Sequence, residues 1–121
     1  MLEVKVNIPD NQVSNVLDKV AESGLCNLVH RRDCKTYIRD PRDDKFKTVE
    51  EEEVTFLIDS SNENAADILT SLIETIASAT DDKFLELSVN SYVEDNETKR
   101  LLTNQMSHEE IDTILGTMHK I

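Results

Sequence analysis

The chain has 121 residues, of which 38% are hydrophobic and 31% charged, so one folded domain is expected and low-complexity disorder is excluded. Its 25 Asp and Glu outnumber its 13 Lys and Arg, which gives a formal net charge of −12. Such a charge repels phosphate backbones and anionic lipids, so we expect neither a direct nucleic-acid partner nor a membrane partner.

The N-terminal quarter of the chain predicts a strand followed by a helix. Every second residue from position 2 to position 8 is apolar, as in a half-buried strand, and Pro9 ends the pattern. Asp10 is placed to cap a helix over about residues 11–23 with its side chain. Gly24 then stands where a left-handed C-terminal cap belongs.

Residues 25–49 combine strand-like stretches with many charges. Strand character is concentrated at residues 28–30 and 36–38, and Pro41 marks an exposed turn. We therefore expect a strand that runs out into a long charged hairpin or loop. Residues 54–58 then predict a third strand, in a central position because Leu57 makes it nearly apolar on both faces.

The second half of the chain predicts a helix, a strand and a second helix. The spacing of Ser60 and Glu63 indicates a capping box before an apolar helical stripe over residues 65–77. Residues 84–89 alternate as a fourth strand. Residues 95–104 are expected to be irregular or to hold a short helix around positions 101 and 102. Ser107 and Glu110 form a second capping box, which opens a C-terminal helix.

This order predicts an α+β, ferredoxin-like βαββαβ fold. Two β-α-β units joined by a hairpin form a four-stranded antiparallel sheet with two helices on one face and an appended C-terminal helix. We expect a single domain over residues 1–121, with a core at 1–95 and an extension at 96–121. Either the C-terminal helix or another subunit is expected to cover the second face of the sheet.

Seven of the 13 basic residues lie within positions 31–47 of an otherwise acidic chain. This asymmetry favours a site for an anionic ligand, such as a nucleotide phosphate. The alternative is an exposed mixed-charge loop, which the four aspartates of the same segment neutralise. The basic residues are Arg31, Arg32, Lys35, Arg39, Arg42, Lys45 and Lys47.

Two groups of residues have donor atoms that suit a metal. Cys26, His30 and Cys34 offer thiolate and imidazole, but an extended strand spaces them too widely to converge on one ion. Residues 50–53 are all glutamate, of which at most two share a strand face, and a solvated acidic run is the alternative. We therefore assign no metal ligand.

No Gly-rich phosphate loop, nucleophile elbow or paired zinc motif occurs in the chain. We assign no catalytic residue and no cofactor, and we expect a binding or regulatory protein, not an enzyme. With two cysteines, no apolar run near the roughly 20 residues of a membrane span and no signal peptide, a reducing cytoplasm is the expected compartment.

The element order, the charged segment between the second and third strands and the stretch Asp81-Asp82-Lys83-Phe84-Leu85 resemble the PII-like and CutA-like trimeric signalling proteins. The resemblance covers about residues 1–95. It implies a homo-oligomer, with a trimer favoured, that binds a nucleotide-like anion at subunit clefts. It also implies that Lys83 contacts the ligand, because that stretch looks like an Asp-Gly-Lys-Ile-Phe motif whose lysine contacts phosphates.

Three functions follow as hypotheses. The first is a regulatory or sequestering protein whose ligand contacts are Lys83, Arg31, Arg32, Lys35 and Arg39. The second is an acidic adaptor or inhibitor that docks on a basic partner protein, for instance as a nucleic-acid mimic. The third is a divalent-metal-binding module that uses Cys26, His30 or the glutamates.

Overall fold

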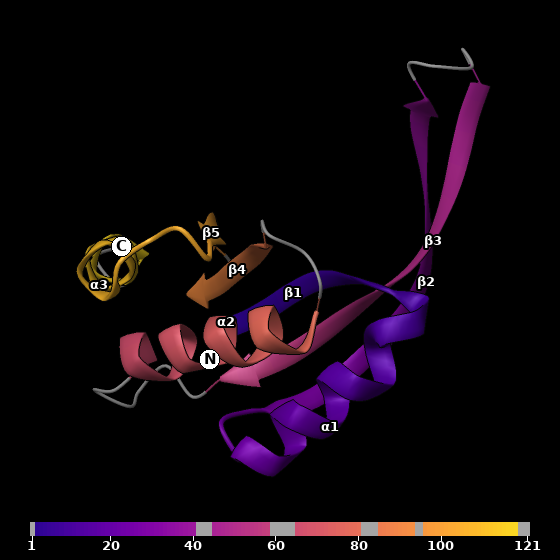
Figure 1. Ribbon diagram of the computed structural model, residues 1–121. Helices are drawn as coiled ribbons and strands as arrows, with labels where there is room; N and C mark the ends of the chain where they lie inside the picture. The colour runs from indigo at the N-terminus through magenta and orange to yellow at the C-terminus, as the bar shows by residue number, and fades with distance from the viewer. Residues whose placement is uncertain (1, 41–44, 59–64, 81–84, 94–95, 119–121) are drawn as a thin grey trace.

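The computed structural model describes residues 2–40, 45–58, 65–80, 85–93 and 96–118, with side chains outside positions 35–49, 92, 93 and 96. These residues form one five-stranded sheet and three α-helices (Figure 1). The elements are β1 (Leu2–Pro9), the 3-10 turn η1 (Asp10–Gln12), α1 (Val13–Ser23), β2 (Asn27–Asp40), β3 (Lys45–Ile58), α2 (Ala65–Ala79), β4 (Glu86–Val93), β5 (Asn96–Thr103) and α3 (His108–Met118).

The sheet is antiparallel throughout and has the strand order β2-β3-β1-β4-β5. The two helical connections, α1 and α2, give the first four strands the expected ferredoxin-like topology, which is confirmed. The prediction of an internal position for the third strand is also correct, because β3 lies between β2 and β1.

The sheet has five strands where four were expected. β5 pairs with β4 from Asn96 to Thr103, so the prediction of an irregular segment or a short helix there was wrong. Leu102 is fully buried while its neighbour Leu101 is 51% exposed, which is the alternation of a strand. β5 is an edge strand with mostly polar residues, and its pairing with β4 determines its conformation more than its own apolar pattern does.

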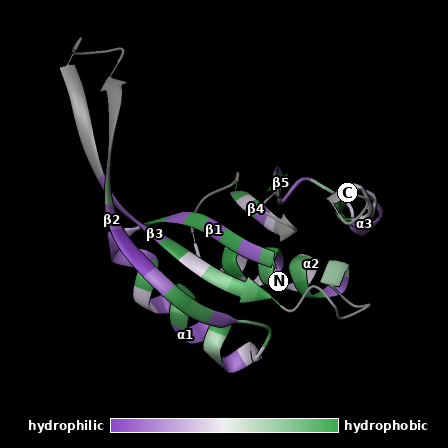
Figure 2. Ribbon diagram, turned by 180° about the vertical axis from the view of Figure 1, so that it is seen from behind, coloured by the Kyte–Doolittle hydropathy of each residue, from purple (hydrophilic) through white to green (hydrophobic). Residues whose placement is uncertain are grey.

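All three helices lie on one side of the sheet, which we call the helix face. Alternate residues of β1 point into this side, and those of β3 and β4 continue the same layer. Figure 2 shows the apolar stretches of β1, β3 and α2 brought together there. Burying one large aliphatic or aromatic side chain stabilises the fold by about 1.5–3 kcal/mol. The largest buried side chains include Phe56, Leu2, Ile8, Leu69, Leu72 and Ile76.

The first helix ends as expected but begins differently. Gly24 adopts φ +65°, and its N–H donates to the carbonyl oxygen of Ala21 at 3.3 Å, which closes a left-handed cap. Asp10 does not cap α1, because it opens a 3-10 turn that precedes the helix. The Asp10 carboxylate therefore remains available for other contacts.

The C-terminal helix begins at the expected capping box. The N–H of Glu110 donates to Ser107 Oγ at 3.2 Å, and the N–H of Ser107 donates to Glu110 Oε1 at 3.4 Å. Ile111 and Leu115 join the core on the side of α2 and β5. The prediction that α3 could cover the opposite face of the sheet was therefore wrong, since its apolar stripe packs on the helix face. We call that opposite face the open face.

The hairpin formed by β2 and β3 is much longer than the rest of the sheet. Each of its strands has 14 residues, against 8 for β1 and β4, and the expected long hairpin is confirmed. β1 pairs with β3 only as far as Glu51, so residues 35–40 and 45–50 form a two-stranded arm that stands out from the body (Figure 1). None of the described helices combines the length and apolar character needed to cross a membrane.

Candidate functional site

Three carboxylates meet where the arm leaves the body of the protein. They belong to Asp10, Asp33 and Glu52, and one oxygen from each lies within 4.8 Å of the others. Among the described residues, this is the group of metal-ligating side chains that the fold brings together. We call it the carboxylate cluster.

The sheet register explains how the three residues converge. Glu52 pairs with Ile8 on one side and with Asp33 on the other, so Glu52 and Asp33 project to the helix face beside the end of β1. Pro9 ends β1, and the 3-10 turn then brings Asp10 over the same place. Two strands and one turn therefore each supply a single ligand.

Arg31 holds one member of the cluster. Its Nε and Nη2 donate to the two oxygens of Glu52 at 2.8 and 2.9 Å, a forked pair that fixes the carboxylate. This hydrogen bond lowers the pKa of Glu52 and raises the pKa of Arg31. The cluster is thus partly neutralised by one exposed guanidinium.

The other carboxylates keep the cluster strongly negative. The pKa of Asp10 is raised above its usual value of 3.8 by desolvation and by repulsion from Glu50, Asp33 and Glu52. Asp10 and Asp33 of the cluster line a small cavity of about 150 Å³ together with Cys34, Glu50 and Glu51. A cation placed there would relieve the repulsion among these groups.

The geometry suits a hard divalent ion. Two oxygens that bind one ion from opposite sides at about 2.4 Å lie about 4.8 Å apart, so the cluster has the dimensions of a coordination shell. Three carboxylate oxygens favour Ca²⁺, Mg²⁺ or Mn²⁺ over the soft metals that thiolates select.

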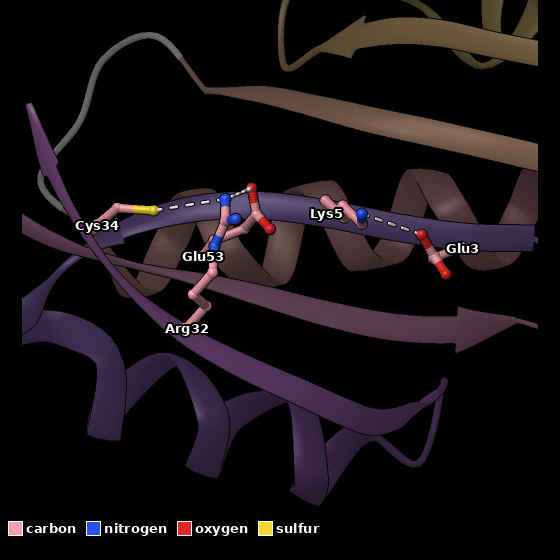
Figure 3. A network of polar contacts seen from close by, with 5 residues as sticks. All are labelled: Glu3, Lys5, Arg32, Cys34 and Glu53. Atoms are coloured by element: carbon pink, nitrogen blue, oxygen red, sulfur yellow. Dashed lines mark hydrogen bonds and ion pairs between the residues drawn. The ribbon is translucent and has the colours of Figure 1, made fainter.

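Two of the ligand-binding residues expected from the sequence lie on opposite faces of β2. Arg31 donates to Glu52 of the carboxylate cluster, while Arg32 projects to the open face and contacts Glu53 at 3.3 Å (Figure 3). Lys35 and Arg39 belong to β2, but their side chains lie outside the described part. Lys83 lies outside the described residues, so the set of ligand contacts stays a prediction.

Cys26, His30 and Cys34 do not gather at one place. A bulge between Leu28 and His30 interrupts the register, and none of the three belongs to the carboxylate cluster. Cys26 is half-buried against the core, and burial raises the pKa of its thiol to about 11. Such a thiol is largely protonated at neutral pH and is a poor metal ligand.

Sequence reasoning missed Asp10 and Asp33 as members of the site. Asp10 has the position of a helix cap, and Asp33 has that of a neutralising charge in a basic segment. The pairing register of the hairpin is the signal that could have found Asp33, because Asp33 pairs directly with Glu52 across β2 and β3.

No protein-family model and no curated protein matches this chain. Solved structures do match it. CutA1 from Pyrococcus horikoshii gives a TM-score of 0.51 at 13% identity, with 100% of each chain covered. The CutA protein of Archaeoglobus fulgidus, described as a periplasmic divalent cation tolerance protein, gives 0.52 at 9% identity, covering 95% of this chain and 99% of that one.

A Bacillus cereus protein related to NIF3 gives a TM-score of 0.53 at 14% identity, covering 97% of this chain and 34% of that one. Similarity at this level of identity concerns the fold. The resemblance to CutA-like proteins inferred from the element order is therefore confirmed as a resemblance of fold: the chain has the architecture of the CutA proteins.

Proposed function

We propose that this protein binds a divalent cation at the carboxylate cluster of Asp10, Asp33 and Glu52. The observation that carries the proposal is the convergence of three carboxylate oxygens within 4.8 Å from three separate elements. The fold adds support, since one protein of similar architecture is described as a divalent cation tolerance protein. We propose a binding protein and not an enzyme, in agreement with the sequence.

The Arg31 guanidinium is a competitor for the cation. It already donates to both oxygens of Glu52, and a cation must share or displace that contact. Affinity is therefore moderate in the parent protein, and removal of Arg31 increases it. A purely structural cluster would not behave in this way, because loss of Arg31 would only destabilise it.

Calorimetric titration with Mn²⁺ tests the proposal. We expect saturable binding that Asp33→Asn and Glu52→Gln each weaken by about tenfold or more, because a charge-assisted contact contributes about 1.5–3 kcal/mol. Arg31→Met strengthens the binding. Asp112→Asn, on the exposed side of α3, removes the same charge far from the cluster and serves as the matched control. Binding that is absent, or that Asp112→Asn weakens as much as Asp33→Asn does, contradicts the proposal.

A second candidate function is the binding of a nucleotide-like anion through Lys83 and the basic residues of β2. Its support is the exposure of the Arg31 and Arg32 side chains, 48% and 62%, near the base of the arm. Calorimetry with ATP should then show saturable heat that Lys83→Ala reduces. A heat that falls equally in the control Lys19→Ala, on α1, would indicate only non-specific attraction.

Self-association is proposed with either function. A two-stranded ribbon without further support is marginally stable in water, and the arm has no described part of its own chain against it. Contact with a second copy would stabilise it.

A further inference from the structure

The open face of the sheet has a hollow that the cation proposal does not use. Its volume is about 570 Å³, which is in the range of small-molecule sites. Strands β1, β4 and β5 supply most of its lining, and Arg32 and Glu53 of the hairpin complete it. We call it the open-face cavity.

Polar atoms without partners lie in the floor of this cavity. Asn90 is only 4% exposed, and its Oδ1 accepts no hydrogen bond in the described structure. Ser88, two residues earlier on the same face, has a buried Oγ that is also unpartnered. A buried polar group without a partner costs about 1–3 kcal/mol, so a ligand that supplies the missing hydrogen bonds recovers that free energy.

The rim of the cavity carries balanced charges. Lys5 contacts Glu3 at 3.3 Å, and Arg32 contacts Glu53 at the same distance. Lys99, which pairs with Asn90 across β4 and β5, makes no ion pair with any described residue.

The lining holds three cationic and three anionic side chains, in a protein whose net charge is −12. The charged residues of the lining are Lys5, Arg32, Lys99, Glu53, Glu86 and Glu97.

We propose that the open-face cavity binds a small zwitterion of the α-amino-acid class. Its carboxylate pairs with the free ammonium of Lys99, and its ammonium donates to Asn90 Oδ1 and faces Glu97, which lies two residues from Lys99 on the same face of β5. A zwitterion carries no net charge, so it approaches this acidic protein without the repulsion that an anion meets. Glu86 and Glu97 repel a free anion inside the cavity as well, whereas the cationic side chains repel a diamine.

The open face suits a second copy of the chain less well than it suits a small ligand. Cores of homodimer interfaces are depleted in charged side chains, whereas this surface carries the six charges of the cavity lining. The one strongly exposed apolar side chain among its lining residues is Leu101. The hollow shape and charge balance therefore favour a small ligand.

NMR titration of the full chain with each of the 20 common α-amino acids tests the proposal. We expect at least one to shift the amide signals of Ser88, Asn90 and Lys99 saturably at millimolar concentration. For that amino acid, the matched amine without the carboxylate and the matched acid without the amine should each bind about tenfold more weakly or not at all, because each lacks one charge-assisted contact.

Two variants separate a binding role from a structural one. Lys99→Met, at an exposed position, should weaken binding about tenfold with no change in melting temperature. Asn90→Leu should abolish binding while the fold keeps its stability, because it removes an unpartnered polar group. Lys19→Met on α1 is the control and should leave binding unchanged.

Three outcomes overturn the proposal. The first is the absence of saturable shifts with every amino acid. The second is binding that survives both Lys99→Met and Asn90→Leu. The third is broadening of the open-face amides that grows with protein concentration, which would show that a second copy covers this face. Failure here leaves the Mn²⁺ titration unaffected, because the two sites lie on opposite faces of the sheet.

Discussion

Asp10 has a different role in the fold from the one that its position in the sequence predicts. Its position after Pro9 is that of a helix cap, yet in the structure it faces two other carboxylates and caps nothing. The free energy of folding is therefore less favourable when its side chain is ionised. A bound cation or a proton would remove the repulsion between Asp10 and the neighbouring carboxylates.

Asp10→Asn should stabilise the protein at neutral pH. The pKa of Asp10 is raised in the folded state, so its contribution to stability is greatest below its usual value of 3.8 and is lost as the pH rises through the folded pKa. Urea unfolding in the presence of a chelator should give a higher midpoint for the variant at about pH 7 and equal midpoints near pH 3, where Asp10 is protonated in both states. A lower midpoint at neutral pH would mean that Asp10 makes a favourable contact.

At the scale of elements, most helices and strands follow from the sequence. The alternation in residues 2–8, Gly24 and the Ser107–Glu110 capping box each gave the right element, because each reflects a local backbone preference. The sequence did not predict β5, since a polar edge strand depends on the pairing that its neighbour provides. The cluster was missed for a similar reason, because its residues meet only through the register of two hairpin strands and a turn.

Leu101 and Leu102 provide a test of β5 as a strand. We expect Leu102→Ala to destabilise the protein by about 2–5 kcal/mol, because it leaves a cavity in the core, while Leu101→Ala changes stability by no more than about 0.5 kcal/mol. Thermal or urea unfolding of the two variants gives the comparison. Similar losses in both would contradict the alternation and favour the helical alternative.

At the scale of the whole molecule, the body and the arm differ in the contacts that stabilise them. The body encloses a core between the sheet and three helices, whereas the described contacts of the arm are the backbone pairs between β2 and β3. This difference underlies the proposal of self-association. The uneven charge of the chain adds to it, because four of the basic residues in positions 31–47 belong to the two strands of the arm.

Light scattering tests the proposed assembly. We expect a mass above that of one 13.8 kDa chain, with three chains favoured by the resemblance to trimeric proteins. Replacement of residues 36–48 by a two-residue turn should lower the mass to that of a single chain while the helical circular dichroism is kept, because the body has its own core. A monomeric parent protein at micromolar concentration would contradict the prediction.

The structure of the arm also determines how its two strands can change in length. Among the described strands, none pairs with the arm beyond Glu51, so each of its strands takes its register from the other. One residue added to each strand moves the tip outward by about 3.4 Å and turns the side chains beyond the insertion to the opposite side. Two added to each strand preserve their orientation. The reach of the arm can therefore change in steps of about 7 Å while the carboxylate cluster at its base keeps its geometry.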